Sequence, residues 1–411
     1  MNKDVTTANK VPTRWHRMLL GSIAMLFSGI IYSWSILKAP LSEEFGWSPS
    51  ALALNFTLTL CFFCIGSIIA SQISKRIGQR LTVIVSCVLL FLGFFFSSRI
   101  TGNILVLYVS YGCMAGLGIG MIYIMILSVT NAWFPDKKGT SAGVLMMSFG
   151  LGSLILGKVA EAMFKSESFG WRGAYLTLGI CISIIIAICA LFLKTPPETV
   201  SFPAPKIPKG QKISESFETR DYTTKEMLKR FSFWRFFFYA ILVCAVGSSV
   251  ISFARDLALS VGASAALAST LAGILSLFNG VGRIVFGLIF DAIGRKKTML
   301  LSNAITIFAP LMVLISLKTN SLSMCIIGLC LTGMGYGSAA MLSSAFTSAF
   351  YGLKHFPLNY SIANTILIPS SFSATLASSL FTATGSYVAS FYMLLSFAVI
   401  ALFINMSIEK P

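Results

Sequence analysis

Charged residues are scarce in this sequence, and histidine is almost absent. Only 11% of the 411 residues are charged, and two residues are histidines. A soluble domain of this length carries more charge, so the composition excludes that class. The sequence offers no catalytic set of a serine, a histidine and an acid and no pair of catalytic acids. Cys61 and Cys64 have CxxC spacing without a histidine or an acid nearby, so we interpret them as packing residues. We therefore expect a protein that is not an enzyme, with no metal site and no cofactor.

Long apolar runs dominate the rest of the sequence, in which 56% of the residues are hydrophobic. Runs of eighteen or more apolar residues are long enough to cross a bilayer as helices. They are continuous rather than alternating, which excludes the strands of a membrane barrel. The sequence thus predicts an all-α, polytopic membrane protein with twelve transmembrane helices in two pseudo-symmetric six-helix bundles. The predicted spans cover residues 17–40, 51–72, 81–99, 104–130, 139–161, 172–194, 233–256, 264–290, 297–317, 322–350, 358–382 and 386–406.

The net charge of +17 comes largely from basic residues in the loops between the spans. Lysines and arginines are frequent in the loops of one side, for example at residues 75–80, 137–138 and 295–297. Loops rich in positive charge face the cytoplasm. We therefore expect a multi-pass protein of the plasma (cell inner) membrane with both termini in the cytoplasm. Bilayer lipid is an expected partner, nucleic acid is not, and we expect the protein to work as a monomer.

A single long hydrophilic segment interrupts the spans. It divides the chain into an N-terminal bundle (1–194), a cytoplasmic linker (195–230) and a C-terminal bundle (231–411). Proline and glycine in the linker argue against regular structure. Near its end, Thr223 and Glu226 have the spacing of a capping box, which predicts a short surface helix leading into the seventh span.

The two halves of the chain repeat a local pattern. Residues 71–80 (SQISKRIGQR) follow the second span, and residues 287–297 (GLIFDAIGRKK) follow the eighth. Both stretches place a small residue, a charged residue and a glycine at the same offsets. Two parallel six-helix repeats with a binding site between them are typical of transporters.

The eighth span contains an arginine, Arg283, at the middle of the membrane. Helices rise about 1.5 Å per residue, so Arg283 lies roughly 12 Å before Asp291, where the helix leaves an apolar layer of about 30 Å. Burying this cation costs on the order of 3 kcal/mol, so it faces a wet cavity or a partner. Ser276 and Asn279 share its helix face. An anion-binding site is our interpretation; a structural arginine that bonds backbone carbonyls is the alternative.

Residues 287–297 resemble the loop motif of the major facilitator superfamily, and the resemblance extends over nearly the whole chain. It implies a conformational, gating role for four residues of the motif: Gly287, Asp291, Gly294 and Arg295. The small residue lets helices cross, and the carboxylate binds a neighbouring helix N-terminus or a basic group. The first copy has Ser71 and Lys75 in place of the glycine and the acid, so its latch is expected to be weak or reversed in charge.

Within this superfamily, the chain resembles the oxalate:formate antiporter family and the monocarboxylate transporters. The stretches that carry the resemblance are GIIYSW (29–34), FGWSPS (45–50), GLGIGMIY (116–123), WFPDKKG (133–139), DYTTKEMLKRFSFW (221–234) and LFNGVGR (277–283). The resemblance implies that Arg283 binds a substrate carboxylate, for which a guanidinium has matching geometry. It also implies a small organic anion as substrate.

Two departures from these relatives refine the expectation. Oxalate transporters of the family carry a lysine in the eleventh span, where this chain has Leu367, so we favour a monocarboxylate of the lactate, pyruvate or formate kind. Monocarboxylate transporters typically have an aspartate one turn before the arginine, where this chain has Asn279, which cannot titrate. Proton symport, exchange against another anion and uniport all stay open. An oxalate/formate-type exchanger and a drug-efflux carrier are the alternatives.

Polar and aromatic residues in other spans complete the predicted site. We expect Asn279, Tyr32, Tyr123, Tyr336 and Asn364 to bind the substrate together with Arg283. A phenol can donate a hydrogen bond to a carboxylate while its ring closes the pocket. Packing of the aromatic rings in the core is the alternative interpretation.

Overall fold

The computed structural model describes residues 14–166, 170–192, 194–197, 202 and 220–409. Its regular elements are helices. In this part of the chain, twelve helical segments are long and apolar enough to cross a membrane. The prediction of an all-α protein with twelve spans is therefore confirmed.

The first six spans contain the following elements: α1 (Trp15–Ser28), η1 (Gly29–Ser33), α2 (Trp34–Phe45), α3 (Pro49–Ile77), α4 (Gln79–Ser98), α5 (Ile104–Leu107), η2 (Tyr108–Ala115), α6 (Gly116–Asn131), α7 (Lys138–Phe164) and α8 (Gly170–Phe192). The short helix α9 (Thr224–Leu228) precedes the second six. These contain α10 (Phe231–Ser260), α11 (Ala265–Ile293), α12 (Arg295–Thr319), α13 (Leu322–Tyr351), α14 (Phe356–Ala363), η4 (Asn364–Ile366), α15 (Leu367–Thr384) and α16 (Tyr387–Met406).

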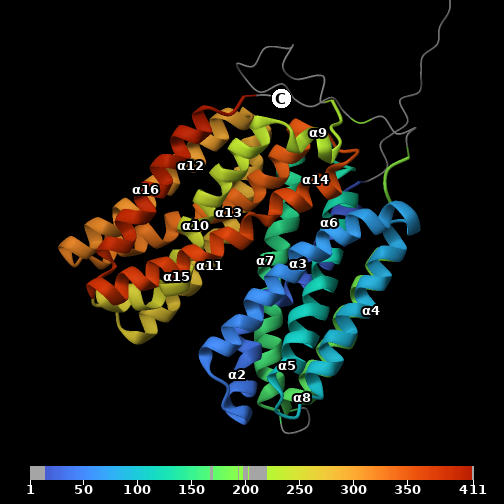
Figure 1. The fold of residues 1–411 in the computed structure, drawn as a ribbon, viewed down its shortest axis with the longest axis horizontal. Coiled ribbons are helices and arrows are strands. Elements are labelled where there is room, and N and C mark those ends of the chain that lie inside the picture. Colours follow the sequence, from blue (N-terminus) through green and yellow to red (C-terminus); the bar gives the residue numbers. More distant parts are fainter. Residues whose placement is uncertain (1–13, 167–169, 193, 198–201, 203–219, 410–411) are drawn as a thin grey trace, which may run out of the picture.

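The helices form two bundles (Figure 1). We call α1–α8 the N-terminal half and α10–α16 the C-terminal half. The halves lie close together at the end that carries α9 and the C-terminus, and they diverge toward the opposite end. We call the first of these the α9 end. Helix α7 packs against α11 and α13, and α3 packs against α14, so these helices join the halves.

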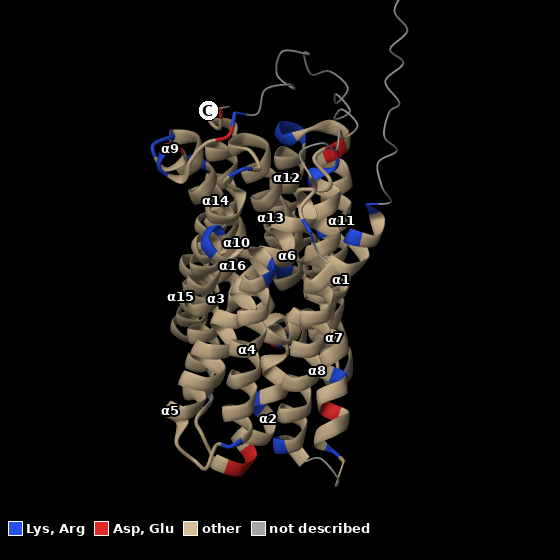
Figure 2. Cartoon of the chain, turned by 90° about the vertical axis from the view of Figure 1, so that its right-hand side faces the viewer, with Lys and Arg blue, Asp and Glu red and all other residues tan. Residues whose placement is uncertain are grey.

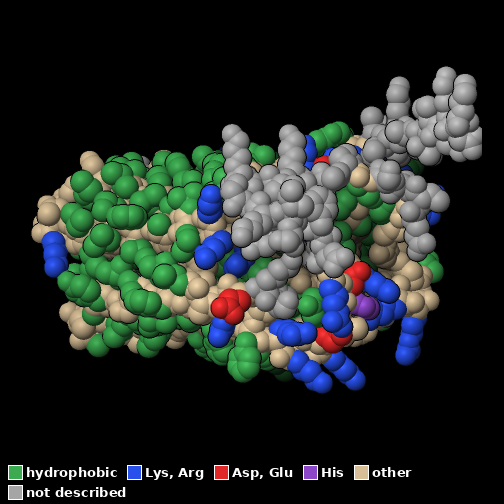
Figure 3. All heavy atoms as spheres, turned by 90° about the horizontal axis from the view of Figure 1, so that it is seen from above, with side chains coloured by type: hydrophobic (Ala, Val, Ile, Leu, Met, Phe, Trp, Pro, Cys, Tyr) green, Lys and Arg blue, Asp and Glu red, His purple; other side chains and the backbone are tan. Residues whose placement is uncertain are grey.

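Most charged residues lie toward the two ends of the bundles, and few lie between them (Figure 2). A view onto the α9 end shows lysines and arginines together with a few acids and a histidine, with hydrophobic side chains on the flank (Figure 3). Large apolar side chains such as Val88, Ile184 and Phe403 are exposed on the outer helices. Such a surface is stable only in contact with lipid, which agrees with a membrane-spanning protein.

Glycines allow the close crossing of α7 and α11 between the halves. A Cβ atom on Gly139 would collide with the carbonyl oxygen of Gly287, and a Cβ atom on Gly287 with that of Gly139. The helices α3 and α11 also end alike, because Gly78 and Gly294 have φ angles of 82° and 76°. Only glycine adopts this conformation without strain.

The predicted surface helix before the seventh span is α9, and its capping box is present. The Thr223 hydroxyl accepts a hydrogen bond from the Glu226 amide at 3.3 Å, and the Glu226 carboxylate accepts one from the Thr223 amide at 2.8 Å. The hydrogen bonds that the Thr223 amide and hydroxyl donate to the Glu226 carboxylate lower the pKa of this carboxyl below its ordinary value. The amide of Tyr222 bonds the carbonyl of Tyr351 at 3.0 Å, which ties the end of the linker to α13.

Candidate substrate-binding site

The first and the eleventh spans each lose their regular α-helical form part of the way along their length. The first span passes through the 3-10 turn η1, and the eleventh through the 3-10 turn η4. Pro369 explains the second break, because its ring clashes with the carbonyl of the residue four positions earlier, Thr365. Irregular backbone is tolerated inside a membrane where it lines a cavity. The two breaks carry Tyr32 and Asn364, two of the predicted site residues.

A cavity of about 500 Å³, including the part that is open to solvent, lies between the halves next to both turns. Both halves provide lining residues. Five come from the N-terminal half: Tyr32, Phe63, Tyr123, Met146 and Phe149. Seven come from the C-terminal half: Cys244, Arg283, Tyr336, Ala340, Asn364, Ile366 and Leu367. Most of these side chains are apolar or aromatic, and Arg283 carries the charge.

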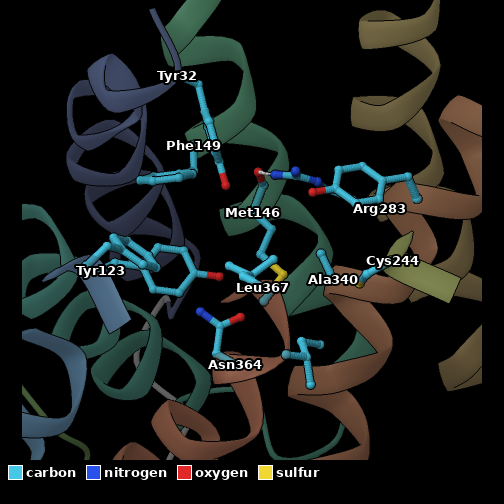
Figure 4. A pocket seen from close by; sticks show the side chains of 12 residues that line it. Tyr32, Tyr123, Met146, Phe149, Cys244, Arg283, Ala340, Asn364 and Leu367 are labelled. Carbon is cyan, nitrogen blue, oxygen red and sulfur yellow. Dashed lines mark hydrogen bonds between the residues drawn. The ribbon is translucent and has the colours of Figure 1, made fainter. Parts of the chain in front are cut away.

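Arg283 reaches across the cavity from α11 to the N-terminal half. Its Nη1 donates a hydrogen bond to the carbonyl oxygen of Met146 on α7 (Figure 4). The residue is 7% exposed, and its Nε atom is buried without a hydrogen-bond partner among the described residues. No ion pair within the described chain includes Arg283. The bond to Met146 agrees with the structural alternative, but it leaves this buried charge without an anion.

Small residues of α7 make room for the arginine. A Cβ atom on Gly143 would collide with the Arg283 carbonyl oxygen, and one on Gly150 would lie 3.3 Å from the guanidinium Nη1. The glycines thus bring α7 close to α11 and leave space for the side chain of Arg283. Neither glycine was among the predicted site residues, although both lie in a glycine-rich helix.

The three predicted tyrosines all line the cavity. The Tyr123 hydroxyl pairs with the hydroxyl of Tyr360 on α14 at 3.0 Å. The hydroxyls of Tyr32 and Tyr336 make no hydrogen bond to the part of the chain that is described, and Tyr32 points into the cavity (Figure 4). Two phenol groups are therefore available to a ligand. Tyr360 was missed, although its spacing of four residues from Asn364 puts both on one helix face.

The two predicted asparagines differ in position. Asn364 lines the cavity, whereas Asn279 is not among the lining residues. The Oδ1 atom of Asn279 is buried without a partner in the described structure, and the residue packs against Gly337 of α13. Ser276, which was predicted to share this helix face, is exposed, and its hydroxyl donates a hydrogen bond to the carbonyl of Ala272 at 3.3 Å.

The apolar wall of the cavity had no signal in the sequence. Phe63, Met146, Phe149 and Ile366 resemble the many other apolar residues of the spans. Tertiary packing alone distinguishes a residue that faces the cavity from one that faces lipid. Leu367, the residue at which the sequence predicted a departure from the oxalate transporters, is part of this wall.

Asp291 connects the halves at the α9 end. Its carboxylate accepts hydrogen bonds from the amides of Gly139 and Thr140 at 2.9 and 2.7 Å, and from the Thr140 hydroxyl at 2.6 Å. These donors form the first turn of α7, where a carboxylate is favoured by the helix dipole. Of the two partners that the motif allows, a helix N-terminus or a basic group, Asp291 has the helix N-terminus. We call this contact the Asp291 latch.

Other motif residues have structural contacts around the latch. Gly287 lies at the α7 crossing, and Gly294 forms the turn after α11. Arg295 donates to the carbonyl of Ile408 at 3.3 Å. Lys138, at the start of α7, donates to the carbonyl of Ser348 on α13 at 3.2 Å, which adds a second polar contact between the halves.

Within the described residues, the first copy of the motif makes no comparable carboxylate contact. Lys75 is exposed and donates to Gln72 on its own helix at 3.3 Å. The hydroxyl of Ser71 lies 3.1 Å from that of Ser361 on α14. A neutral serine pair therefore occupies the place between α3 and α14 that corresponds to the glycine crossing of α7 and α11.

Comparisons with known proteins show the family and the fold of this chain. The model of the Major Facilitator Superfamily matches residues 18–255 and 241–409. An uncharacterized MFS-type transporter, YhjX, of Escherichia coli (strain K12) is 28% identical over 87% of this chain and 86% of its own. The oxalate:formate antiporter of Oxalobacter formigenes is 26% identical over 70% of this chain and 65% of its own.

A human monocarboxylate transporter, number 11, is 30% identical over 40% of this chain and 34% of its own. Among solved structures, the proton:xylose symporter XylE has a TM-score of 0.74, with 15% identity over 97% of this chain and 96% of that one. At this identity, the structural likeness concerns the fold alone.

Proposed function

This chain belongs to the major facilitator superfamily, and on that premise we propose that it carries small monocarboxylates across the membrane, with Arg283 as the anion-binding residue. The family comprises membrane transporters, and the resemblance drawn from the sequence motifs is confirmed. One observation carries the proposal. Arg283 is a nearly buried cation beside a cavity, and no acid in the described chain forms an ion pair with it.

A buried charge without a counter-charge is unfavourable in a medium of low dielectric constant. A substrate carboxylate would remove this cost, since it can accept two hydrogen bonds from a guanidinium. The unpaired hydroxyls of Tyr32 and Tyr336 provide further donors. Each of these interactions favours an anion in the cavity.

One carboxylate balances the charge of the site. Among the twelve lining residues, Arg283 is the cation, and Leu367 stands where oxalate transporters of the family have a lysine. A dicarboxylate would leave one negative charge uncompensated, which favours a monocarboxylate of the lactate, pyruvate or formate kind. A drug-efflux carrier for cations would need an acid in the cavity, and its described lining has none.

The transport cycle that we propose is a rocking of the two halves around the cavity. In this conformation the Asp291 latch and the Tyr123–Tyr360 pair join the halves on the side of the α9 end. The charge bias of the loops favours a cytoplasmic location for that end, so the cavity would open outward. The carboxylate would compete with the Met146 carbonyl for Arg283, which couples binding to a contact between the halves.

The lining of the cavity, as far as the chain is described, contains no carboxylate that could carry a proton. Exchange against a counter-anion, or entry of the substrate with its own proton, requires no such group. The printed names of two relatives, an oxalate:formate antiporter and a monocarboxylate transporter, support carriage of small carboxylates. Exchange of the oxalate/formate type is the second candidate.

Uptake of labelled lactate, pyruvate and formate into proteoliposomes tests the proposal. We expect Arg283→Ala to abolish uptake and Arg283→Lys to retain a small part of it, since lysine keeps the charge but not the bidentate geometry. Arg99→Ala is the matched control, because Arg99 is exposed at the end of α4. Transport at the wild-type rate by correctly inserted Arg283→Ala would refute the role of this residue.

A further inference from the structure

We propose that Asn364 recognises an uncharged hydroxyl or oxo group on the carboxylate substrate, so that the preferred substrates are hydroxy or oxo monocarboxylates rather than plain alkyl ones. This inference rests on the proposed function and assigns the second polar contact of the same site. Asn364 is 7% exposed and lines the cavity. Its carboxamide makes no hydrogen bond to any described residue, and it points toward the centre of the cavity (Figure 4).

The local structure explains why this side chain faces the cavity. Asn364 begins the 3-10 turn η4, which interrupts the eleventh span before Pro369. The carbonyl oxygen of Asn364 accepts a weak hydrogen bond from the Cys64 thiol of α3 at 3.9 Å. The break changes the direction in which side chains leave the helix, and the contact with α3 holds the turn against the other half.

The carboxamide of Asn364 faces the cavity from a wall that is mostly apolar or aromatic, and a few polar groups in such a wall are the usual means by which a pocket orients its ligand. No described side chain bonds this carboxamide, and the Tyr123 hydroxyl, which also lines the cavity, bonds that of Tyr360 instead. A bound ligand would supply the missing partner. Arg283 and Asn364, which both belong to the C-terminal half, would then bind two different groups of one molecule.

The chemistry of this second group follows from that of the amide. A carboxamide both donates and accepts hydrogen bonds but carries no charge. It therefore suits a hydroxyl or a carbonyl oxygen, whereas a second carboxylate would gain no counter-charge. Ile366 and Leu367 beside it are apolar and cover the hydrocarbon part of such a substrate.

Competition against a labelled monocarboxylate in proteoliposomes measures this preference. The probes are butyrate, 2-hydroxybutyrate, 3-hydroxybutyrate, 2-oxobutyrate and succinate, which share a four-carbon chain. We expect at least one hydroxy or oxo acid to compete about 3- to 10-fold better than butyrate, as one net hydrogen bond predicts. Succinate is expected to compete least well.

The variant Asn364→Leu should remove the advantage of the hydroxy and oxo acids over butyrate, which is measured as the ratio of their competition to that of butyrate in the same variant. Thr365→Val is the matched control, because the Thr365 hydroxyl bonds the Ile362 carbonyl at 2.8 Å and the residue does not line the cavity. An unchanged preference in Asn364→Leu would overturn the inference. The wild-type protein provides a second test if that variant does not fold, since no advantage over butyrate in the wild type would also overturn it.

The outcomes separate the two proposals. Binding of all monocarboxylates with equal strength would refute the role of Asn364 and leave the carboxylate carrier intact. Failure of every acid to compete, together with no effect of Arg283→Ala, would refute the proposed function itself.

Discussion

Replacing Asp291 with asparagine should weaken the closure of the protein at the α9 end. Asp291 accepts hydrogen bonds from three donors in the first turn of α7. Asparagine has one acceptor oxygen and carries no charge, so it would retain about one of these bonds and place its amino group against the other donors.

The size of the effect follows from these contacts. A hydrogen bond to a charged group contributes about 1.5–3 kcal/mol, a neutral one about 1 kcal/mol, and an acid at a helix N-terminus about 0.3–1 kcal/mol. Because Asp291 is partly exposed, we take the loss as about 2–3 kcal/mol. At about 1.4 kcal/mol per factor of ten, the ratio of closed to open conformers at this end falls by roughly 30- to 150-fold.

Distances between spin labels across the α9 end measure this ratio. Labels at Lys75 and Lys354 lie on exposed sites of the two halves, on a background in which reactive cysteines are replaced. We expect Asp291→Asn to broaden the distance distribution and shift it to longer values. Asp256→Asn, which changes an exposed acid of α10, serves as the control.

A distance distribution identical to the wild type in folded Asp291→Asn would refute this reasoning. It would mean that the neutral contacts of the interface, such as the glycine crossing at Gly139 and Gly287, suffice to keep the α9 end closed. A shift of equal size in Asp256→Asn would show that the loss of any acid has this effect.

Two further predictions concern the cavity and the linker. Leu367→Lys adds a second cation to the cavity wall. We therefore expect the preference for succinate over butyrate to rise by tenfold or more in the competition assay. An unchanged preference would show that position 367 does not correspond to the lysine of the oxalate transporters. Gly352→Ala should lower the melting temperature by several degrees more than Gly385→Ala in a thermal-shift assay. Both glycines have a positive φ angle, but a Cβ atom on Gly352 would collide with Asp221, whereas one on Gly385 meets nothing within 4 Å. Equal shifts would show that backbone strain, and not the contact with the linker, accounts for the loss.

Much of the fold could be predicted because its cause is local. Each span is an apolar run bounded by polar residues, and hydropathy depends on neighbours in the sequence. The capping box of Thr223 and Glu226 is likewise a pattern within four residues, and it is present in the structure. The break of the eleventh span near Asn364 follows from Pro369 for the same reason.

The candidate site could be predicted only in part. Helical periodicity placed Asn279 on the face of Arg283, but the structure divides that face between the cavity and the packing against α13. Tyr360 was missed because its partner, Tyr123, is 237 positions away. A helix face is a direction, and the sequence does not specify which neighbour lies in that direction.

The sequence by itself determined the membrane class, the number of spans, the repeated loop motif and the presence of a cation at mid-membrane, since each depends on composition or spacing along one helix. Only the tertiary structure decided which groups meet that cation. The bond from Arg283 to Met146, the latch from Asp291 to α7 and the unpaired carboxamide of Asn364 all depend on how helices of different spans approach one another. That approach is set by close packing of glycines and side chains between the two halves, which no local pattern encodes.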